Sequence, residues 1–226
     1  MRPHYACAFR YDACQMIRTI TSLAAGTLLA ASLLTAAEWK QLFNGKDMNG
    51  WEHVGPGQFV LESGLLKTEG GMGLLWYKGE KLGNCTLRVV FRTLSTPGAN
   101  SGVYIRMEEA PKDPWYGVHN GYEVQIDGQA DDWHATGAIY SLSKIEKRVQ
   151  KPAGEWNTME ITLKGSQTLV KLNGEIINDY KDGQPVPERK QWFEPVRGPR
   201  PDSGYIGLQN HDPKSVVEFR EIAVSK

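Results

Sequence analysis

The segment at residues 121–127 alternates bulky apolar side chains with polar ones. Its polar members are Glu123, Gln125 and Asp127, and its apolar members are Tyr122, Val124 and Ile126. Because successive side chains of a β-strand point to opposite faces, one face should join a core while the other presents two carboxyl groups and an amide. Carboxyl groups can act as general acids or bases, and an amide can bind hydroxyl groups. The pattern therefore predicts a strand that forms the floor of a polar cleft.

Most of the chain after residue 38 consists of short strand-like segments separated by turn residues. The clearest hairpin joins residues 158–164 to residues 168–172, and Asn173-Gly174 is typical of a type I′ turn. Residues 181–203 hold five prolines and cannot form a central strand. No helix of ordinary length shows an apolar stripe. Many short strands with intervening turns predict an all-β sandwich or jelly roll of two antiparallel sheets.

The first 37 residues are predicted to be a signal peptide, with cleavage after Ala37 and with Met16 as an alternative start. We therefore expect a single domain over residues 38–226, exported to the periplasm or the extracellular space. No other segment approaches the ~18 apolar residues of a membrane span, so none is expected in the mature chain. Lys+Arg and Asp+Glu both number 26, and no basic patch points to nucleic acid. Cys85 alternates in phase with apolar neighbours and is expected to be a small buried side chain.

Six motifs are distributed over the mature chain: LFNGKDMNGW (42–51), NSGVYIR (100–106), GYEVQIDG (121–128), GEWNTMEI (154–161), LNGE (172–175) and GYIGLQNH (204–211). Together and in this order they resemble one known family, the 3-keto-disaccharide hydrolases, once called domain of unknown function 1080. The resemblance implies a concanavalin A-like jelly roll of two curved antiparallel sheets, the concave one binding sugar. It also implies cleavage of a glycosidic bond in a sugar oxidised to the ketone at C3. This chain departs from the family pattern where Asp212, and not glycine, follows His211.

In such a jelly roll, three strands present polar faces to one cleft. We expect Glu123, His211, Arg106 and Asp127 to be the catalytic candidates. Glu123 could equally form a structural ion pair, Arg106 a surface pair, Asp127 a turn and His211 a loop contact to backbone. The expected substrate-binding residues are Gln125, Tyr104, Gln209, Trp76, Trp133 and His134.

The aromatic candidates rest on a weaker argument, because indole rings stack on sugars but also pack in cores. Of Trp76, Trp133 and Trp192, we expect one to line the cleft. No cofactor is certain from the sequence, although a divalent cation could assist at the ketone. Two acidic residues, Asp131 and Asp132, fall short of a full oxygen shell for calcium.

The resemblance leads to a chemical hypothesis in which the C3 ketone acidifies the proton on C2. Either His211 or Glu123 would remove that proton, Arg106 would polarise the ketone, and Asp127 or Glu123 would protonate the leaving oxygen. Two alternatives stay open. One is ordinary glycoside hydrolysis by Glu123 and Asp127, although four strand residues span roughly 13 Å and retaining chemistry needs carboxyls about 5–5.5 Å apart. The other is a carbohydrate-binding module without catalysis.

Overall fold

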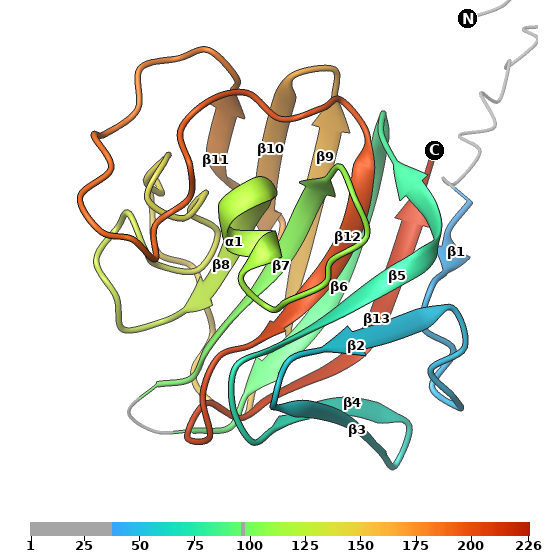
Figure 1. Ribbon diagram of the computed structural model, residues 1–226. Helices are drawn as coiled ribbons and strands as arrows, with labels where there is room; N and C mark the ends of the chain where they lie inside the picture. The colour runs from blue at the N-terminus through green and yellow to red at the C-terminus, as the bar shows by residue number, and fades with distance from the viewer. Residues whose placement is uncertain (1–37, 96–97) are drawn as a thin grey trace, which may run out of the picture. The chain divides into compact units, whose positions relative to one another are not determined.

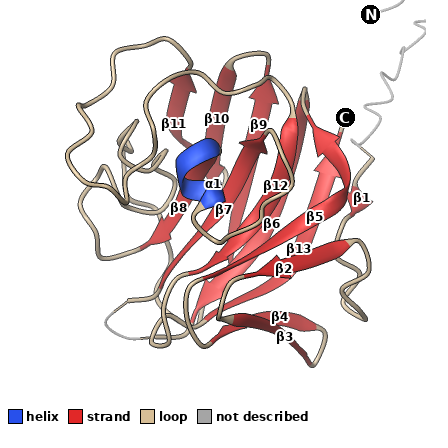
Figure 2. Cartoon of the chain, viewed as in Figure 1, coloured by secondary structure: helices blue, strands red, loops and turns tan. Residues whose placement is uncertain are grey.

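The structure is a computed structural model that describes residues 38–95 and 98–226. The predicted signal peptide and the alternative start at Met16 lie outside the described residues. Within them the fold is all-β, as predicted: two antiparallel sheets pack face to face, and helical structure is limited to the short α1 (Figures 1 and 2). In the described ranges no helix has the length and apolar character needed to cross a bilayer.

The larger sheet has eight strands in the order β11-β10-β9-β6-β13-β4-β3, and β1 pairs with β13. Its strands are β1 (Lys40–Gln41), β3 (Gln58–Glu62), β4 (Leu65–Glu69), β6 (Cys85–Thr93), β9 (Asn157–Lys164), β10 (Gln167–Leu172), β11 (Glu175–Lys181) and β13 (Val217–Ser225). The predicted hairpin of β9 and β10 is confirmed. At the next turn Asn173 and Gly174 both have positive φ, 53° and 89°, as a type I′ turn requires.

The smaller sheet has five strands in the order β2-β5-β12-β7-β8. Its strands are β2 (Trp51–Val54), β5 (Gly73–Leu82), β7 (Asn100–Met107), β8 (Tyr122–Asp127) and β12 (Gly204–Asn210). The helix α1 (Tyr116–Asn120) lies against β7 and β8, in front of this sheet in Figure 1. The outer face of the five-stranded sheet is thus partly covered by α1 and loops.

The hydrophobic core fills the space between the two sheets. The apolar members of β8, Tyr122, Val124 and Ile126, are fully buried in it, so the predicted inward face is confirmed. Cys85 is buried in the same core, and burial raises the pKa of its thiol to about 11. A second, smaller apolar cluster lies under α1 on the other face of the five-stranded sheet and includes Tyr104 and Val118. This second cluster supports the polar residues of the site.

Candidate functional site

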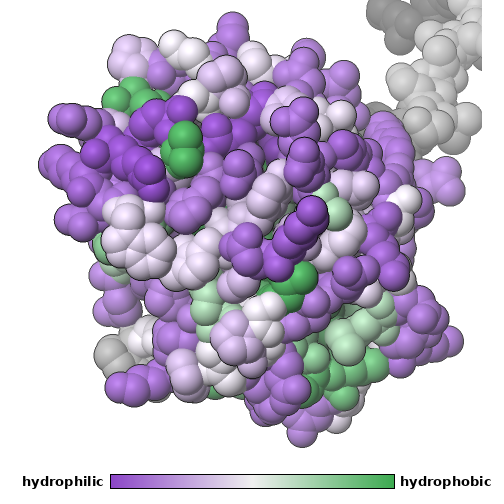
Figure 3. Space-filling model, in the orientation of Figure 1, coloured by the Kyte–Doolittle hydropathy of each residue, from purple (hydrophilic) through white to green (hydrophobic). Residues whose placement is uncertain are grey.

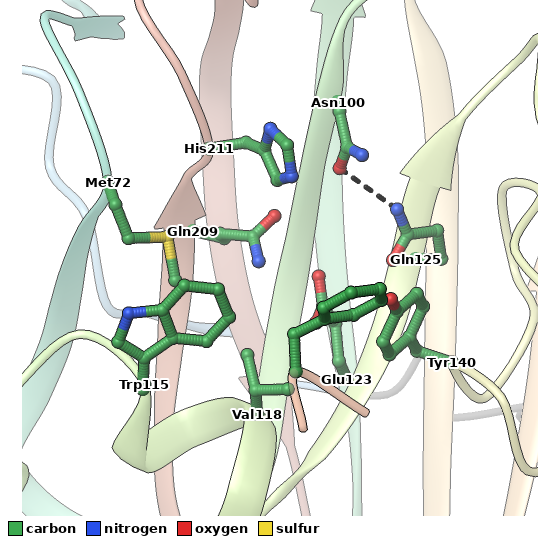
Figure 4. Close-up of a pocket in the computed structure, with 10 residues that line it drawn as sticks. Met72, Asn100, Trp115, Val118, Glu123, Gln125, Tyr140, Gln209 and His211 are labelled. Carbon is green, nitrogen blue, oxygen red and sulfur yellow. Dashed lines mark hydrogen bonds between the residues drawn. The ribbon is translucent and has the colours of Figure 1, made fainter. Parts of the chain in front are cut away.

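A pocket of about 280 Å³ opens on the outer face of the five-stranded sheet (Figure 4). That volume is near the lower end of ligand pockets, about 300–1,000 Å³, and suits one sugar ring. The polar residues that line it are Asn100, Glu123, Gln125, Gln209 and His211. The other lining residues are Met72, Trp115, Val118, Tyr140 and Phe193. Strand β8 and the end of β12 therefore bring together four predicted polar residues, Glu123, Gln125, Gln209 and His211, and β7 adds Asn100.

Glu123 lies at the floor of this pocket and is only 5% exposed. Its Oε1 atom is buried without a hydrogen-bond partner among the described residues. Burial raises the pKa of the Glu123 carboxyl to about 8, against a smaller opposing effect of the Gln209 amide. Near neutral pH this side chain is therefore mostly protonated and can donate a proton, as a general acid must.

Gly102 makes room for the Glu123 carboxyl. It lies on the neighbouring strand β7 and is paired with Gln125, two positions along from the pair of Tyr104 and Glu123. A Cβ atom at residue 102 would lie 2.3 Å from Glu123 Oε1 and 2.7 Å from its Cγ. The observed position of the Glu123 carboxyl therefore requires glycine, which has no side chain, at position 102 of the adjacent strand.

We expect Gly102→Ala to displace the Glu123 carboxyl and to lower kcat about 10- to 100-fold, because small misplacements of reacting groups are costly. The three atoms nearest to the new methyl group all belong to Glu123, so the change should act mainly on the position of this carboxyl. Turnover and thermal melting would be measured together. The control is Gly71→Ala, where an added Cβ meets no atom within 4 Å. Unchanged turnover in Gly102→Ala would show that the position of this carboxyl is not critical.

Two glutamine side chains flank the acid and are held by single hydrogen bonds. Gln125 donates to Asn100 Oδ1 at 2.9 Å, shown as the dashed line in Figure 4, and Gln209 donates to the Tyr104 hydroxyl at 2.7 Å. Their Oε1 atoms are buried and, like Glu123 Oε1, have no partner among the described residues. Buried acceptors without partners are costly, and hydroxyl groups of a bound ligand could satisfy them.

Tyr104 supports the site from below. It is fully buried and accepts the hydrogen bond from Gln209, and it does not line the pocket. The prediction that Tyr104 lies on the same sheet face as Glu123 is confirmed by their pairing, but direct contact with substrate is not supported. Tyr104 fixes the amide that lines the pocket.

His211 follows β12 and lines the pocket on the side of Gln209 (Figure 4). Its Nδ1 lies 2.8 Å from Asp212 Oδ2, and Ser215 donates to the same carboxylate at 2.7 Å. Partial burial opposes ionisation, but hydrogen bonds from Ser215 and His211 lower the pKa of Asp212 to about 2. The ionised carboxylate can only accept, so Nδ1 carries the proton and Nε2 keeps its lone pair. A neutral imidazole held in this tautomer can act as a base.

Arg106 does not lie on the cleft floor, and this prediction is wrong. Its backbone adopts a left-handed conformation, with φ of 58°, so the strand alternation fails at this residue. The guanidinium is fully buried and donates to the carbonyl groups of Pro201, Gly165 and Gln167, at 2.7–3.0 Å. Arg106 thus ties β7 to the β9–β10 turn and to the proline-rich segment.

We expect Arg106→Gln to lower the free energy of unfolding by about 2–4 kcal/mol, because it leaves buried carbonyl groups unpaired. Chemical denaturation would measure this loss. At a temperature where the variant is folded, kcat should stay within about twofold of the wild-type value. A loss of kcat without a loss of stability would contradict this structural role and return Arg106 to the reaction.

Asp127 also lies outside the pocket. Its Oδ1 accepts from the backbone N–H groups of Gln129 and Ala130, at 2.8 and 3.2 Å, and so stabilises the turn after β8. The alternative of a turn-forming aspartate is the correct one, and the predicted catalytic placement is wrong. The pocket lining then contains one carboxyl group, that of Glu123.

The three tryptophans predicted as candidates for the cleft lie elsewhere. Trp76 is buried and packs edge-on against Tyr205 at 4.9 Å between ring centroids, away from the pocket. Trp192 is 63% exposed and packs on Trp115, which does line the pocket. Trp133 and His134 line a separate, neighbouring hollow. None of the three predicted tryptophans lines the pocket that holds Glu123.

Several lining residues were not predicted from the sequence. Asn100 lies two residues before Gly102 and four before Tyr104, on the same face of the strand. Extending the alternating pattern two residues toward the N-terminus would have predicted it. Trp115, Tyr140 and Phe193 come from α1's N-terminal side and from loops, where no periodicity indicates direction. Phe193 belongs to the proline-rich segment, which Arg200 ties to the carbonyl groups of His119 and Gly121.

The residues of the pocket do not form a metal set. They offer one carboxyl, one imidazole and amides, and within the described ranges no three His, Cys, Asp or Glu side chains converge as ligands. Asp131 and Asp132, considered for calcium, instead contact His134 and Arg148.

A jelly roll with a small pocket of mixed lining on its outer sheet face, where the described residues leave three buried side-chain acceptors unpartnered, suits a carbohydrate-active or carbohydrate-binding class of protein. The model of the 3-keto-alpha-glucoside-1,2-lyase-like domain family matches residues 38–225, and the chain belongs to this family. None of the curated proteins compared with the chain matches it.

Several solved structures share this fold. A candidate glycosyl hydrolase from Parabacteroides distasonis has 26% sequence identity and a TM-score of 0.68, covering 84% of this chain and 99% of that one. A second from the same organism has 22% identity and a TM-score of 0.68, covering 83% and 93%. A carbohydrate-binding module from Bacillus subtilis shares the fold, with 13% identity, a TM-score of 0.53, and coverage of 78% and 96%.

Proposed function

We propose that this protein cleaves the bond between C1 and its glycosidic oxygen in 3-keto-glycosides, by elimination across C1 and C2. The proposal is supported by one pocket that holds both a buried Glu123, whose pKa is raised, and a His211 whose Nδ1 is held by Asp212. One group can donate a proton and the other can accept one, and both line the same pocket.

In the first step, His211 Nε2 removes the proton on C2. The electron pair of that C–H bond becomes an enolate with the C3 ketone. As the C3 carbonyl re-forms, the pair makes a C1–C2 double bond, the bond from C1 to oxygen breaks, and Glu123 donates its proton to the leaving oxygen. The products are an alcohol and an unsaturated 3-keto sugar, leaving His211 protonated and Glu123 ionised.

Hydration of the unsaturated product would use the same two groups in reverse. Ionised Glu123 takes a proton from water as the water oxygen attacks C1, and protonated His211 returns a proton to C2. Both groups then regain their starting states. The amides of Gln125, Gln209 and Asn100 are placed to bind hydroxyl groups and the ketone oxygen during these steps.

The test compares a 3-keto disaccharide with its unoxidised parent, with and without a chelator, and follows the released sugar. We expect release from the 3-keto substrate alone, and a substrate deuterated at C2 should react more slowly. Equal cleavage of the unoxidised parent would overturn the proposal in favour of ordinary hydrolysis. That alternative is disfavoured by the structure because Asp127 lies outside the pocket and no second carboxyl lines it.

A carbohydrate-binding function without catalysis is the second candidate, because a binding module shares the fold. A buried carboxyl with a raised pKa and an oriented histidine exceed what sugar binding needs, and such perturbed groups cluster at active sites. Affinity for a glycan with no turnover of any 3-keto sugar would support binding alone.

We also propose that the protein acts outside the cytoplasm, on the basis of the signal-like residues 1–37. Amino-terminal sequencing of protein recovered from outside the cytoplasm is expected to start at Glu38. Recovery of the uncleaved chain from the cytoplasm alone would contradict this.

A further inference from the structure

A second hollow of about 190 Å³ lies beside the pocket of Glu123. We call it the Trp133 hollow, and its lining includes Trp133, His134, Ser141, Glu188 and Lys190, and the ion-paired Glu194 and Arg197. The two spaces share a wall: the His134 ring lies 5.1 Å from the ring of Tyr140, which lines the first pocket. In each of two loops, neighbouring residues line different spaces. Tyr140 and Phe193 line the pocket of Glu123, and the residues that follow them, Ser141 and Glu194, line the Trp133 hollow.

The Trp133 hollow is held in shape without a ligand. His134 has both ring nitrogens engaged, with Nδ1 2.9 Å from Asp131 and Nε2 2.9 Å from Ser141. The backbone N–H of Trp133 donates to the same Asp131 carboxylate at 2.9 Å. A histidine fixed at both nitrogens is a rigid wall, unlike His211, whose Nε2 is free of partners among the described residues. Such rigidity reduces the entropy lost on binding.

The chemistry of the Trp133 hollow suits a neutral, polar ring. Trp133 is 36% exposed and offers an aromatic face, while Arg197 and Glu194 pair at 2.8 Å and largely cancel their charges. Glu188 and Lys190 add one charge of each sign at the rim. The face drawn in Figure 3 is mainly hydrophilic at the left, where Figure 1 places the loops after β8 and β11, and its larger apolar area lies at the lower right. A sugar ring combines apolar C–H faces with hydroxyl groups and matches this lining.

We propose that the Trp133 hollow binds the leaving-group sugar of a 3-keto disaccharide, while the 3-keto ring occupies the pocket of Glu123. This assignment rests on the proposed function. It specifies that the substrate has two sugar rings and that Trp133 stacks on the second one. His134 acts here as a positioning residue, because it holds the wall between the two spaces.

The test compares Trp133→Ala with the wild type on two substrates, a 3-keto disaccharide and the matching 3-keto methyl glycoside. We expect kcat/KM for the disaccharide to fall about tenfold and that for the methyl glycoside to stay within about twofold. Glu188→Ala, at an exposed position of the same hollow, should act in the same direction with a smaller effect. The matched control is Trp156→Ala, since Trp156 packs between Arg92 and Arg220 and lines neither space.

The outcomes separate the two proposals. Equal losses on both substrates, or no loss on the disaccharide, would overturn the assignment of the Trp133 hollow and leave the proposed reaction standing. Wild-type protein that cleaves neither substrate would overturn the proposed function and the assignment with it. A loss confined to the disaccharide supports both.

Discussion

Glu123→Gln is expected to lower kcat by about three orders of magnitude, within the 10²- to 10⁴-fold range of general acid catalysis. The glutamine side chain keeps the size and the hydrogen-bonding capacity of the protonated acid but cannot give a proton to the leaving oxygen. KM should therefore change little. The matched control is Asp127→Asn, which should retain turnover because Asp127 caps a turn outside the pocket. Wild-type turnover in Glu123→Gln would remove this residue from the mechanism.

The same substitution should change how stability depends on pH. The pKa of Glu123 is raised from 4.5 to about 8 in the folded protein, so the folded state holds this proton more tightly than the unfolded state. The contribution of protonated Glu123 to the free energy of unfolding is fully present below pH ~4.5 and is lost as the pH rises toward about 8. The loss is roughly 3–5 kcal/mol by the conversion of one pKa unit to 1.36 kcal/mol.

Glu123→Gln lacks this titration, so its stability relative to the wild type should rise between pH 5 and pH 9. Denaturant unfolding at several pH values would measure the difference. Activity of the wild type should fall as the pH rises through about 8, where the acid loses its proton. Parallel stability curves for the two proteins would show that Glu123 is not a buried protonated acid.

The alternation of residues 121–127 predicted the direction of Glu123 and Gln125 because a regular strand has a strict period of two. The same rule failed at Arg106, the seventh residue of β7, because one left-handed residue reverses the direction of the side chain. Arginine carries no sequence signal for that conformation, unlike Asn173-Gly174, whose positive φ values were predictable from residue type. The inward and outward faces were thus predictable only where the backbone stays extended.

Asp127 shows a different limit of the sequence. Its spacing placed it on the same face as Glu123, but the strand ends there and the carboxylate binds the backbone of the following turn. The loop residues Tyr140 and Phe193 could not be predicted, because their positions depend on long-range contacts such as those of Arg200. The strand residues at the floor of the site, such as Glu123 and Gln125, could therefore be predicted from the sequence pattern. The loop residues that form its walls could not.

Asp212, which set this chain apart from the family pattern, gains a role from the structure. Its carboxylate accepts from His211, from Ser215 and from the backbone N–H of Lys214. The turn after β12 thus fixes both the position and the tautomer of the histidine. Glycine at this position could not do so, since it has no side chain, and a relative with glycine would have to orient its histidine by other contacts.

His211→Ala should abolish removal of the C2 proton, with a fall in kcat of about 10³-fold, whereas Asp212→Asn should lower kcat about tenfold and leave KM nearly unchanged. The decisive measurement is exchange of the C2 hydrogen of a 3-keto substrate with D₂O. If His211 is the base and Glu123 the acid, Glu123→Gln keeps this exchange while releasing sugar about 10³-fold more slowly, because the enolate forms but no side chain protonates the leaving oxygen. His211→Ala loses both exchange and release. Exchange that persists in His211→Ala and disappears in Glu123→Gln would reverse the two roles, since the carboxylate form of Glu123 would then be the group that accepts the C2 proton.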